Sequence, residues 1–250
     1  GSVGGGLAYL AGAAAIDAIA DWDRSWNPWL AALEPWQLVF MIVGLPGLAI
    51  SLLLLTVREP VRREGSGRTD DDSLFSAPFV AFLRARRATF TWHFLGFAMF
   101  GVLTYGVLSW VAAYFVRHFG WTMSQFGYAF GWAYLVCGSA GATLGGWYAT
   151  RLRERGRRAG SMTTAALGVT ATVPLAFAAC LVPDATLALV LFASAIFAFA
   201  FPSGASIAAI QEITPNEFRG RTSALYYLTM NMIGLELGPV SVGLVSDYVL

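Results

Sequence analysis

The chain contains little charge, little cysteine or histidine, and no lysine. Only 12% of its 250 residues are charged, whereas 57% are hydrophobic. Soluble domains carry about twice that share of charge, so the composition argues against a soluble globular protein. The formal net charge of +1 gives no electrostatic reason to expect a nucleic-acid partner. All 16 basic residues are arginines, a bias from which we infer no function.

Cysteine and histidine are too sparse to suggest a metal site. Cys137 and Cys180 both lie inside apolar runs, which is typical of small core residues and not of a disulfide or a metal pair. The two histidines, His93 and His118, lie far from each other in the sequence, so they do not suggest a pair of metal ligands. No phosphate-binding loop and no nucleophile–base set appears. We therefore expect no metal, no cofactor and no enzymatic activity.

Apolar runs recur along the whole chain. A helix needs roughly 20 apolar residues to cross the hydrocarbon core of a membrane. Seven runs reach or approach that length, at 1–20, 36–57, 88–115, 124–148, 159–182, 185–210 and 222–248. The pattern predicts an all-α integral membrane helix bundle. A buried hairpin in a soluble helical protein is the alternative for any one run, and the recurrence disfavours it.

The arginines gather in every second connection between these runs. Only Arg24 and Arg117 lie in the other connections. Arginine-rich loops usually face the cytoplasm. We therefore expect a multi-pass protein of the plasma or inner membrane, with three segments on the cytoplasmic side: 58–87, 151–158 and 211–221.

The longest polar connection, 58–87, has two parts. Its first part is rich in charge, and we expect it to be mobile. Its second part, 76–87, combines Phe79 and Phe82 with three arginines, which suits a helix lying along the membrane surface. The chain begins and ends inside apolar runs, so we expect further helices on both sides of it.

The loop between the fourth and fifth runs resembles a signature of the major facilitator superfamily, roughly Gly-x-x-x-Asp-Arg-x-Gly-Arg-Arg. Thr150 stands where the signature has Asp, which would weaken a charged latch. There is also a three-residue insertion. The matching positions are Gly145, Gly146, Arg151, Gly156, Arg157 and Arg158.

Two more stretches are similar to the spinster-like branch of that family. Residues 36–60 resemble its sixth helix. Residues 215–221, with the later Asn231, Gly234 and Gly238, resemble its tenth loop and eleventh helix. The resemblance covers helices five to eleven of twelve. It implies that residues 1–57 end an N-terminal half, 58–88 link the halves, and 89–250 form a C-terminal half without its last helix.

The resemblance also implies a function. It points to a secondary active transporter that works by alternating access, as a symporter or antiporter. The implied substrate is a small organic solute, amphiphilic or lipid-like, with or without proton coupling. The implied partners are this solute, membrane lipids and protons, and we expect a monomer. A scaffold or receptor-like membrane protein without transport is the alternative, but no loop is long enough for a folded domain outside the membrane.

Glu236 lies near the middle of the last run, where an isolated carboxylate costs about 3 kcal/mol or more. It could couple protons or contact substrate in a cavity. Alternatively, it could be paired or protonated within helix packing. Asn231 lies five residues earlier, roughly 140° away around the helix, so the two side chains cannot both point into one cavity. Asn231 either packs against a neighbouring helix or contacts substrate.

Aromatic and hydroxyl side chains concentrate in the run 88–115. By the resemblance, this helix lines the transport cavity, and four residues are the candidate substrate contacts: Tyr105, Ser109, Trp110 and Tyr114. Aromatic packing between helices is the alternative. His93, near the cytoplasmic end of the same run, is either an interfacial residue or a proton relay.

Several residues are candidates for gating. Pro202 interrupts the sixth run and predicts a helix bend, either a gating kink or a static one. Pro46 predicts a second bend. Ion pairs at the cytoplasmic face could close an inward gate, unless that loop is merely solvated. In addition to Pro202, the candidate gating residues are Gly146, Arg151, Arg157, Arg158, Glu217 and Arg219.

Overall fold

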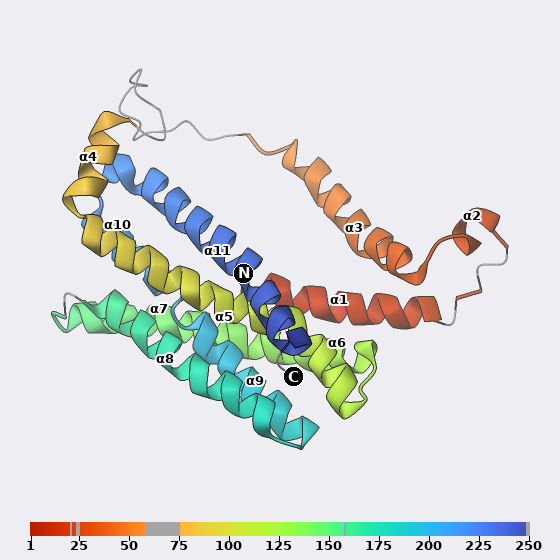
Figure 1. Ribbon diagram of the computed structural model, residues 1–250. Coiled ribbons are helices and arrows are strands. Elements are labelled where there is room, and N and C mark those ends of the chain that lie inside the picture. The colour runs from red at the N-terminus through yellow and green to blue at the C-terminus, as the bar shows by residue number, and fades with distance from the viewer. Residues whose placement is uncertain (21, 24–25, 59–75, 158, 249–250) are drawn as a thin grey trace.

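The structure is a computed structural model, which describes residues 1–20, 22–23, 26–58, 76–157 and 159–248. This described part contains helices and no strand, which confirms the all-α prediction (Figure 1). The helices are α1 (Ser2–Ala20), α2 (Pro28–Ala31), α3 (Pro35–Leu54), α4 (Ala77–Ala85), α5 (Arg87–Phe119), α6 (Met123–Ala133), the π-helical turn η1 (Tyr134–Gly138), α7 (Ser139–Glu154), α8 (Gly160–Leu181), α9 (Ala185–Ala200), α10 (Ser203–Ile213), the 3₁₀ turn η2 (Asn216–Phe218) and α11 (Arg219–Tyr248).

Within the described residues, six helical stretches are long and apolar enough to cross a membrane. They correspond to six of the seven predicted runs: α1, α3, α5, α8, α9 with α10, and η2 with α11. The remaining predicted run, 124–148, is also helical, but η1 divides it into α6 and α7 and the helix continues to Glu154. Such π turns widen a helix locally and are frequent at functional sites.

Local sequence explains where these helices start and stop. Thr122 and Gln125 form a reciprocal capping box at the start of α6, with hydrogen bonds of 3.0 and 3.1 Å. Asp184 caps α9 by accepting a 2.7 Å hydrogen bond from the Leu187 amide. Gly120 ends α5 with φ of +70°, a left-handed conformation that glycine adopts without strain.

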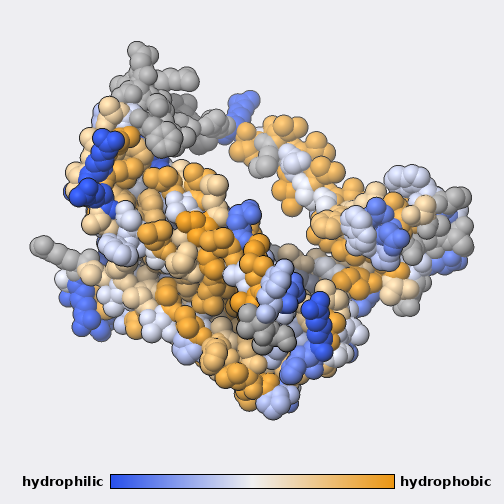
Figure 2. All heavy atoms as spheres, in the orientation of Figure 1, coloured by the Kyte–Doolittle hydropathy of each residue, from blue (hydrophilic) through white to orange (hydrophobic). Residues whose placement is uncertain are grey.

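The helices from α5 onward form one packed bundle. α5 lies beside α11 along much of its length, and α8 lies beside α9 (Figure 1). α1 packs on α6 and η1, whereas α3 packs on α1 and stands apart from the rest. Large apolar side chains cover α3, as Figure 2 shows in orange, and most of them are exposed. Apolar surface of this kind is expected of helices that face lipid or neighbouring membrane helices.

The two predicted proline bends differ. Pro202 does interrupt its helix, because α9 ends at Ala200 and α10 begins at Ser203. α3 instead runs through Pro46 without interruption, so the kink expected there does not break the helix. A proline in a helix removes only one backbone hydrogen bond, and spanning helices tolerate that loss.

The predicted surface helix exists as α4, but its apolar face is turned toward the bundle. Phe79 is fully buried, and its ring lies 5.5 Å from the ring of Phe218. Arg221 donates a 2.7 Å hydrogen bond to the Ser76 hydroxyl, and Arg86 donates one to the Ile213 carbonyl. α4 is therefore held against the loop before α11 through Phe79 and these hydrogen bonds, and its position relative to the membrane surface stays a prediction.

The described parts of the three arginine-rich segments meet at one end of the bundle. α4 contacts the loop 214–218, and Arg153 of α7 pairs with Glu212 of α10. Residues 59–75 and Arg158, which belong to the predicted cytoplasmic segments, lie outside the described residues. The gathering at one end agrees with the predicted alternation. Which side of the membrane this end faces stays a prediction.

Candidate functional site

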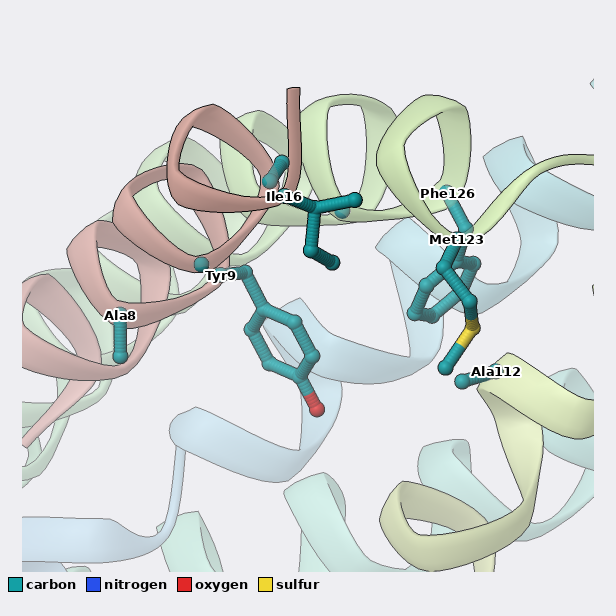
Figure 3. Close-up of a pocket in the computed structure, with 9 residues that line it drawn as sticks. Ala8, Tyr9, Ile16, Ala112, Met123 and Phe126 are labelled. Atoms are coloured by element: carbon teal, nitrogen blue, oxygen red, sulfur yellow. The ribbon is translucent and has the colours of Figure 1, made fainter. Parts of the chain in front are cut away.

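A cavity of about 270 Å³ lies where α1 meets α5 and α6. Figure 3 shows Tyr9 of α1 extending into this space, with Met123 and Phe126 of α6 and Ala112 of α5 around it. The Tyr9 hydroxyl is the one polar side-chain group among the lining residues, which also include Ala8, Gly12, Ala13, Ile16 and Gly127. The arrangement can hold an apolar group and offer it a single hydrogen-bonding partner.

Glycines let α1 and α6 approach closely beside this cavity. A Cβ built on Gly127 would lie 2.8 Å from the Cβ of Ala13, and one on Gly131 would lie 2.9 Å from Cγ of Leu10. The Tyr9 ring fills the adjoining space, with its centroid 5.1 Å from that of Phe130. Small residues at such contacts allow close backbone packing, which drives helix association in membranes.

Two of the predicted substrate contacts are brought together. The Tyr105 hydroxyl donates a 2.8 Å hydrogen bond to Oδ1 of Asn231, linking α5 to α11. The Asn231 amide nitrogen donates to the Tyr227 carbonyl on its own helix at 2.8 Å. Trp110 donates a 3.0 Å hydrogen bond from Nε1 to the Pro239 carbonyl. Asn231 thus packs against the neighbouring helix α5 and also takes part in a polar contact there. Helix packing and contact with substrate, the two interpretations of this residue, are therefore compatible.

Tyr114 and Ser109 do not join this pair. The Tyr114 hydroxyl lies 3.4 Å from the backbone carbonyls of Ala179 and Cys180 on α8, which places its ring in the aromatic core and away from α11. Ser109 is exposed. Tyr114 follows Tyr105 by nine residues, about two and a half helical turns, so the two rings leave opposite sides of α5. Helical geometry therefore explains why a single wall of four side chains does not form.

Glu236 lies on the side of α11 that faces away from α5. Gly234 and Gly238 make the contact with α5, and Glu236 stands about 200° around the helix from each of them. Its side chain is exposed, and no described residue forms a hydrogen bond or ion pair with it. Glu236 and Asn231 therefore point in different directions, as expected.

At the arginine-rich end, a small polar network ties three helices together. Arg153 of α7 forms a 3.4 Å ion pair with Glu212 of α10, and the Ser161 hydroxyl of α8 donates a 2.7 Å hydrogen bond to the same carboxylate. Arg153 and Ser161 were not among the predicted gating residues. Arg151 was among them, and within the described residues its ion pair is with Glu154 on its own helix, at 3.6 Å between exposed side chains. Exposed pairs of that kind contribute little.

The other gating candidates make local contacts or none. Arg219 donates to the Thr214 carbonyl and to Asn216 Oδ1, both at 3.3 Å, and so braces its own loop. Glu217 and Arg157 are exposed, and neither forms an ion pair with a described residue. Arg158 lies outside the described residues, so its place is not assigned.

Two glycines pack closely at the break near Pro202. Gly145 faces the Phe201 backbone, and a Cβ on Gly168 would lie 2.5 Å from Cδ of Pro202. A Cβ on Gly145 would collide with the carbonyl of Phe201, whereas Gly146 faces open space. The predicted gating residue Gly146 therefore makes no close helix contact, and its neighbour makes the contact instead. Gly145 sits directly against the break between α9 and α10, which couples α7 to the bend at Pro202.

Comparison with known proteins agrees with this architecture. The sequence model of the Major Facilitator Superfamily matches residues 1–239. Protein spinster homolog 1 of Bos taurus is 30% identical over 191 residues, which covers 71% of this chain and 34% of that protein. Protein spinster homolog 1 of Homo sapiens is 32% identical over 117 residues, covering 46% and 20% respectively. The chain thus spans about a third or less of the length of these relatives.

Two solved structures resemble the fold. Both are crystal structures of a bacterial homolog to the human lysosomal transporter spinster, in inward-facing conformations. The unoccupied one gives a TM-score of 0.73 at 27% identity and covers 95% of this chain and 52% of that chain. The occupied one gives a TM-score of 0.67 at 26% identity, covering 95% and 51%. The chain belongs to the Major Facilitator Superfamily, and within it to the spinster-like branch.

Proposed function

We propose that this chain is part of a secondary active transporter that carries an organic, amphiphilic solute by alternating access. The observation that supports this most directly is the apolar cavity between α1, α5 and α6, with the single hydroxyl of Tyr9 in its lining. The similarity to a homolog of a lysosomal transporter supports the same assignment. The alternative is a membrane scaffold or receptor-like protein, which would not need such a cavity.

The proposed division of the chain into two halves places the cavity at the boundary between them. We assign α1 and α3 to the end of an N-terminal half, 58–88 to the connection, and α5–α11 to a C-terminal half. The cavity then lies between the halves, where transporters of this type bind substrate. α1 is the described element that bridges the two groups, because it packs on α6 and η1.

The lining fits one end of an amphiphile. Burying an alkyl chain contributes about 0.8 kcal/mol per methylene group, so an apolar cavity alone can select a solute with a tail. The Tyr9 hydroxyl and the linked pair Tyr105–Asn231 offer hydrogen bonds for a polar portion. We propose that the chain acts as a monomer in the plasma or inner membrane, with lipids covering its outer surface.

We further propose that transport is coupled to protons through Glu236. No described residue pairs with its carboxylate, although it stands in the middle of a spanning helix, where charge is costly. Replacing Glu236 with Gln should preserve the fold and the exchange of solute across the membrane. Accumulation driven by a pH gradient should be lost. Undiminished gradient-driven uptake by Glu236→Gln would remove the coupling role and leave the transport assignment intact.

The transport proposal can be tested with the full-length protein in liposomes. The probe is a fluorescent single-chain amphiphile, and its uptake is compared with protein-free liposomes. Ala112→Phe fills the cavity and should reduce uptake about tenfold or more, as a blocked binding site requires. Ala113→Phe is the matched control, because Ala113 is adjacent but does not line the cavity. If the wild type shows no uptake of any amphiphile tested, the scaffold alternative is favoured.

A further inference from the structure

His93 is buried inside the bundle. The sequence alone allowed two interpretations of this residue, an interfacial residue or a proton relay. It lies in the second turn of α5 and is 7% exposed. Its ring centroid is 4.8 Å from that of Phe97 and 5.7 Å from that of Tyr226 on α11. Its Nε2 atom is buried and has no hydrogen-bond partner. A buried polar atom without a partner is rare and calls for an unseen partner or a function.

Polar groups surround His93 at the break between α9 and α10. The Tyr226 hydroxyl donates a 3.2 Å hydrogen bond to the Ser206 hydroxyl, and Ser206 donates a 3.3 Å bond to the Ser203 carbonyl. The His93 side chain lies beside the Ser206 backbone. Ser203 and Ser206 open α10 directly after Pro202. His93 is therefore connected to the one interruption between α9 and α10.

A cavity of about 150 Å³ adjoins this cluster. It shares Phe97, Ser206 and Tyr226 with the surroundings of His93. Water occupies about 30 Å³ per molecule in the liquid, so the space has room for several waters, and the hydroxyl groups of its lining could give them partners. A second buried polar atom without a partner, Oγ1 of Thr222, lies one helical turn before Tyr226 on α11.

The charge environment of His93 is simple. Its neighbours are Phe94 and Phe97 on α5, Ser206 on α10 and Tyr226 on α11, and Tyr226 is the only other titratable group among them. No carboxylate and no arginine contacts the ring in the described part of the chain. A proton on the ring would be stabilised by the aromatic faces and by the hydroxyl groups and water of the cavity. No fixed anion would hold the ring permanently in the charged form.

We propose that His93, Ser206 and Tyr226 form a proton-binding site that senses pH at the cytoplasmic end of the bundle and biases the bend at Pro202. Nε2 takes a proton from cavity water, and the neutral imidazole becomes an imidazolium; no other bond changes. His93 is six residues, about 9 Å, from the first residue of α5, so it lies close to that end of the bundle. The new N–H donor then competes for the hydroxyl groups that open α10.

The first test measures the proton itself and needs no transport. Full-length protein is prepared with ¹⁵N-labelled histidine rings, and the His93 signal is identified by its loss in His93→Gln. A change from the neutral to the charged ring signal is expected between about pH 5 and 8, the range in which histidine switches. A His93 ring that keeps one form throughout that range overturns the proposal, whatever the transport assay shows.

The second test rests on the proposed transport function. Exchange of the fluorescent amphiphile is measured at different pH on the cytoplasmic side. Wild type should change its rate about fivefold across the histidine range, and His93→Gln should flatten that profile. His118→Gln is the control, because His118 is exposed at the other end of α5 and should leave the profile unchanged. An unchanged profile in His93→Gln refutes the sensing role.

Tyr226→Phe guards against a folding defect in the histidine variant. It keeps the ring that packs on His93 but removes the hydroxyl that reaches Ser206. The midpoint of the ring titration should shift, and the pH profile of exchange should shift with it. If neither the midpoint of the ring titration nor that of the pH profile moves, Tyr226 is not part of the proton-binding site and the proposal is contradicted. If the ring titrates but no amphiphile is exchanged, the proton site stands and the transport proposal fails.

Discussion

The contact between α5 and α11 and the contact between α1 and α6 both depend on glycine, yet they are built differently. In the first, a Cβ on Gly238 would lie 2.7 Å from the Val102 carbonyl, so backbone meets backbone. Hydrogen bonds from Tyr105 and Trp110 then join the two helices. In the second, the atoms nearest to a Cβ on Gly127 or Gly131 belong to side chains, with backbone atoms at 3.1–3.3 Å, and a cavity of about 270 Å³ remains beside the contact.

The difference has a mechanical meaning. A tightly packed contact with cross-linking hydrogen bonds loses many interactions when it opens, because dispersion and hydrogen bonds are lost together. A contact beside a cavity already lacks part of that packing, so separation costs less. Under the proposed division into halves, α5 and α11 move as one body, and α1 and α6 are the pair that must separate during transport.

Locking the contact between α1 and α6 should have the largest effect. Leu10→Cys with Gly131→Cys suits a disulfide, because a Cβ on Gly131 would lie 2.9 Å from the Cγ position of Leu10. We expect oxidation to reduce amphiphile uptake about tenfold or more, since a trapped contact cannot alternate. Reduction should restore it. The experiment uses a background in which Cys137 and Cys180 are replaced by serine.

The matched cross-link joins α5 to α11. A Cβ on Gly106 would lie 3.2 Å from Cγ2 of Val242, so Gly106→Cys with Val242→Cys offers similar geometry. Oxidation of this pair should leave most of the uptake intact. Equal inhibition by both cross-links would show that the two contacts do not differ in the way proposed.

The positions of the helices were predictable from the sequence because long apolar runs leave few other choices. The predicted run 159–182 and the helix Gly160–Leu181 nearly coincide, for example. The π turn at Tyr134–Gly138 could not be foreseen, since one widened turn changes no pattern of hydrophobic residues. The orientation of Tyr114 could have been foreseen, because its angle from Tyr105 follows from helix geometry alone.

Contacts between distant segments were beyond sequence reasoning. Arginines alternate along 151–157, and nothing local distinguishes Arg153, which meets Glu212, from Arg151, which does not. His93 stayed open for the same reason, since α10 and α11 bury it. The contact of α4 with Phe218 could not be predicted either, because the phenylalanines of α4 suit lipid and protein equally well.

A second prediction concerns stability and has a smaller effect. Gly238→Ala places a methyl group 2.7 Å from the Val102 carbonyl and 2.8 Å from the Gly106 amide nitrogen, and backbone atoms cannot yield cheaply. We expect a loss of about 1–3 kcal/mol, as overpacking in cores usually costs. Gly127→Ala meets the Ala13 side chain at 2.8 Å and should destabilise less, because the cavity beside this contact leaves room for the two helices to shift.

Thermal unfolding of the purified protein in detergent measures both effects. Gly146→Ala is the control, because it faces open space within α7 and gains up to about 1 kcal/mol of helix propensity. Its unfolding temperature should stay level or rise. A larger loss in Gly127→Ala than in Gly238→Ala would reverse the comparison between the two contacts.

The smallest predicted effect tests whether the hydrogen bond between Tyr105 and Asn231 serves the substrate or only the packing. Tyr105→Phe removes a 2.8 Å bond worth about 1 kcal/mol and frees Oδ1 of Asn231. If the pair presents its polar groups to the solute, the KM for the amphiphile should rise about fivefold, the equivalent of that energy, with little change in unfolding temperature. Tyr114→Phe loses only two 3.4 Å contacts on the far side of α5 and should leave KM unchanged. A lower unfolding temperature in Tyr105→Phe with an unchanged KM would instead show that the bond stabilises the contact between α5 and α11. The polar portion of the substrate would then have to be bound in the cavity beside Tyr9.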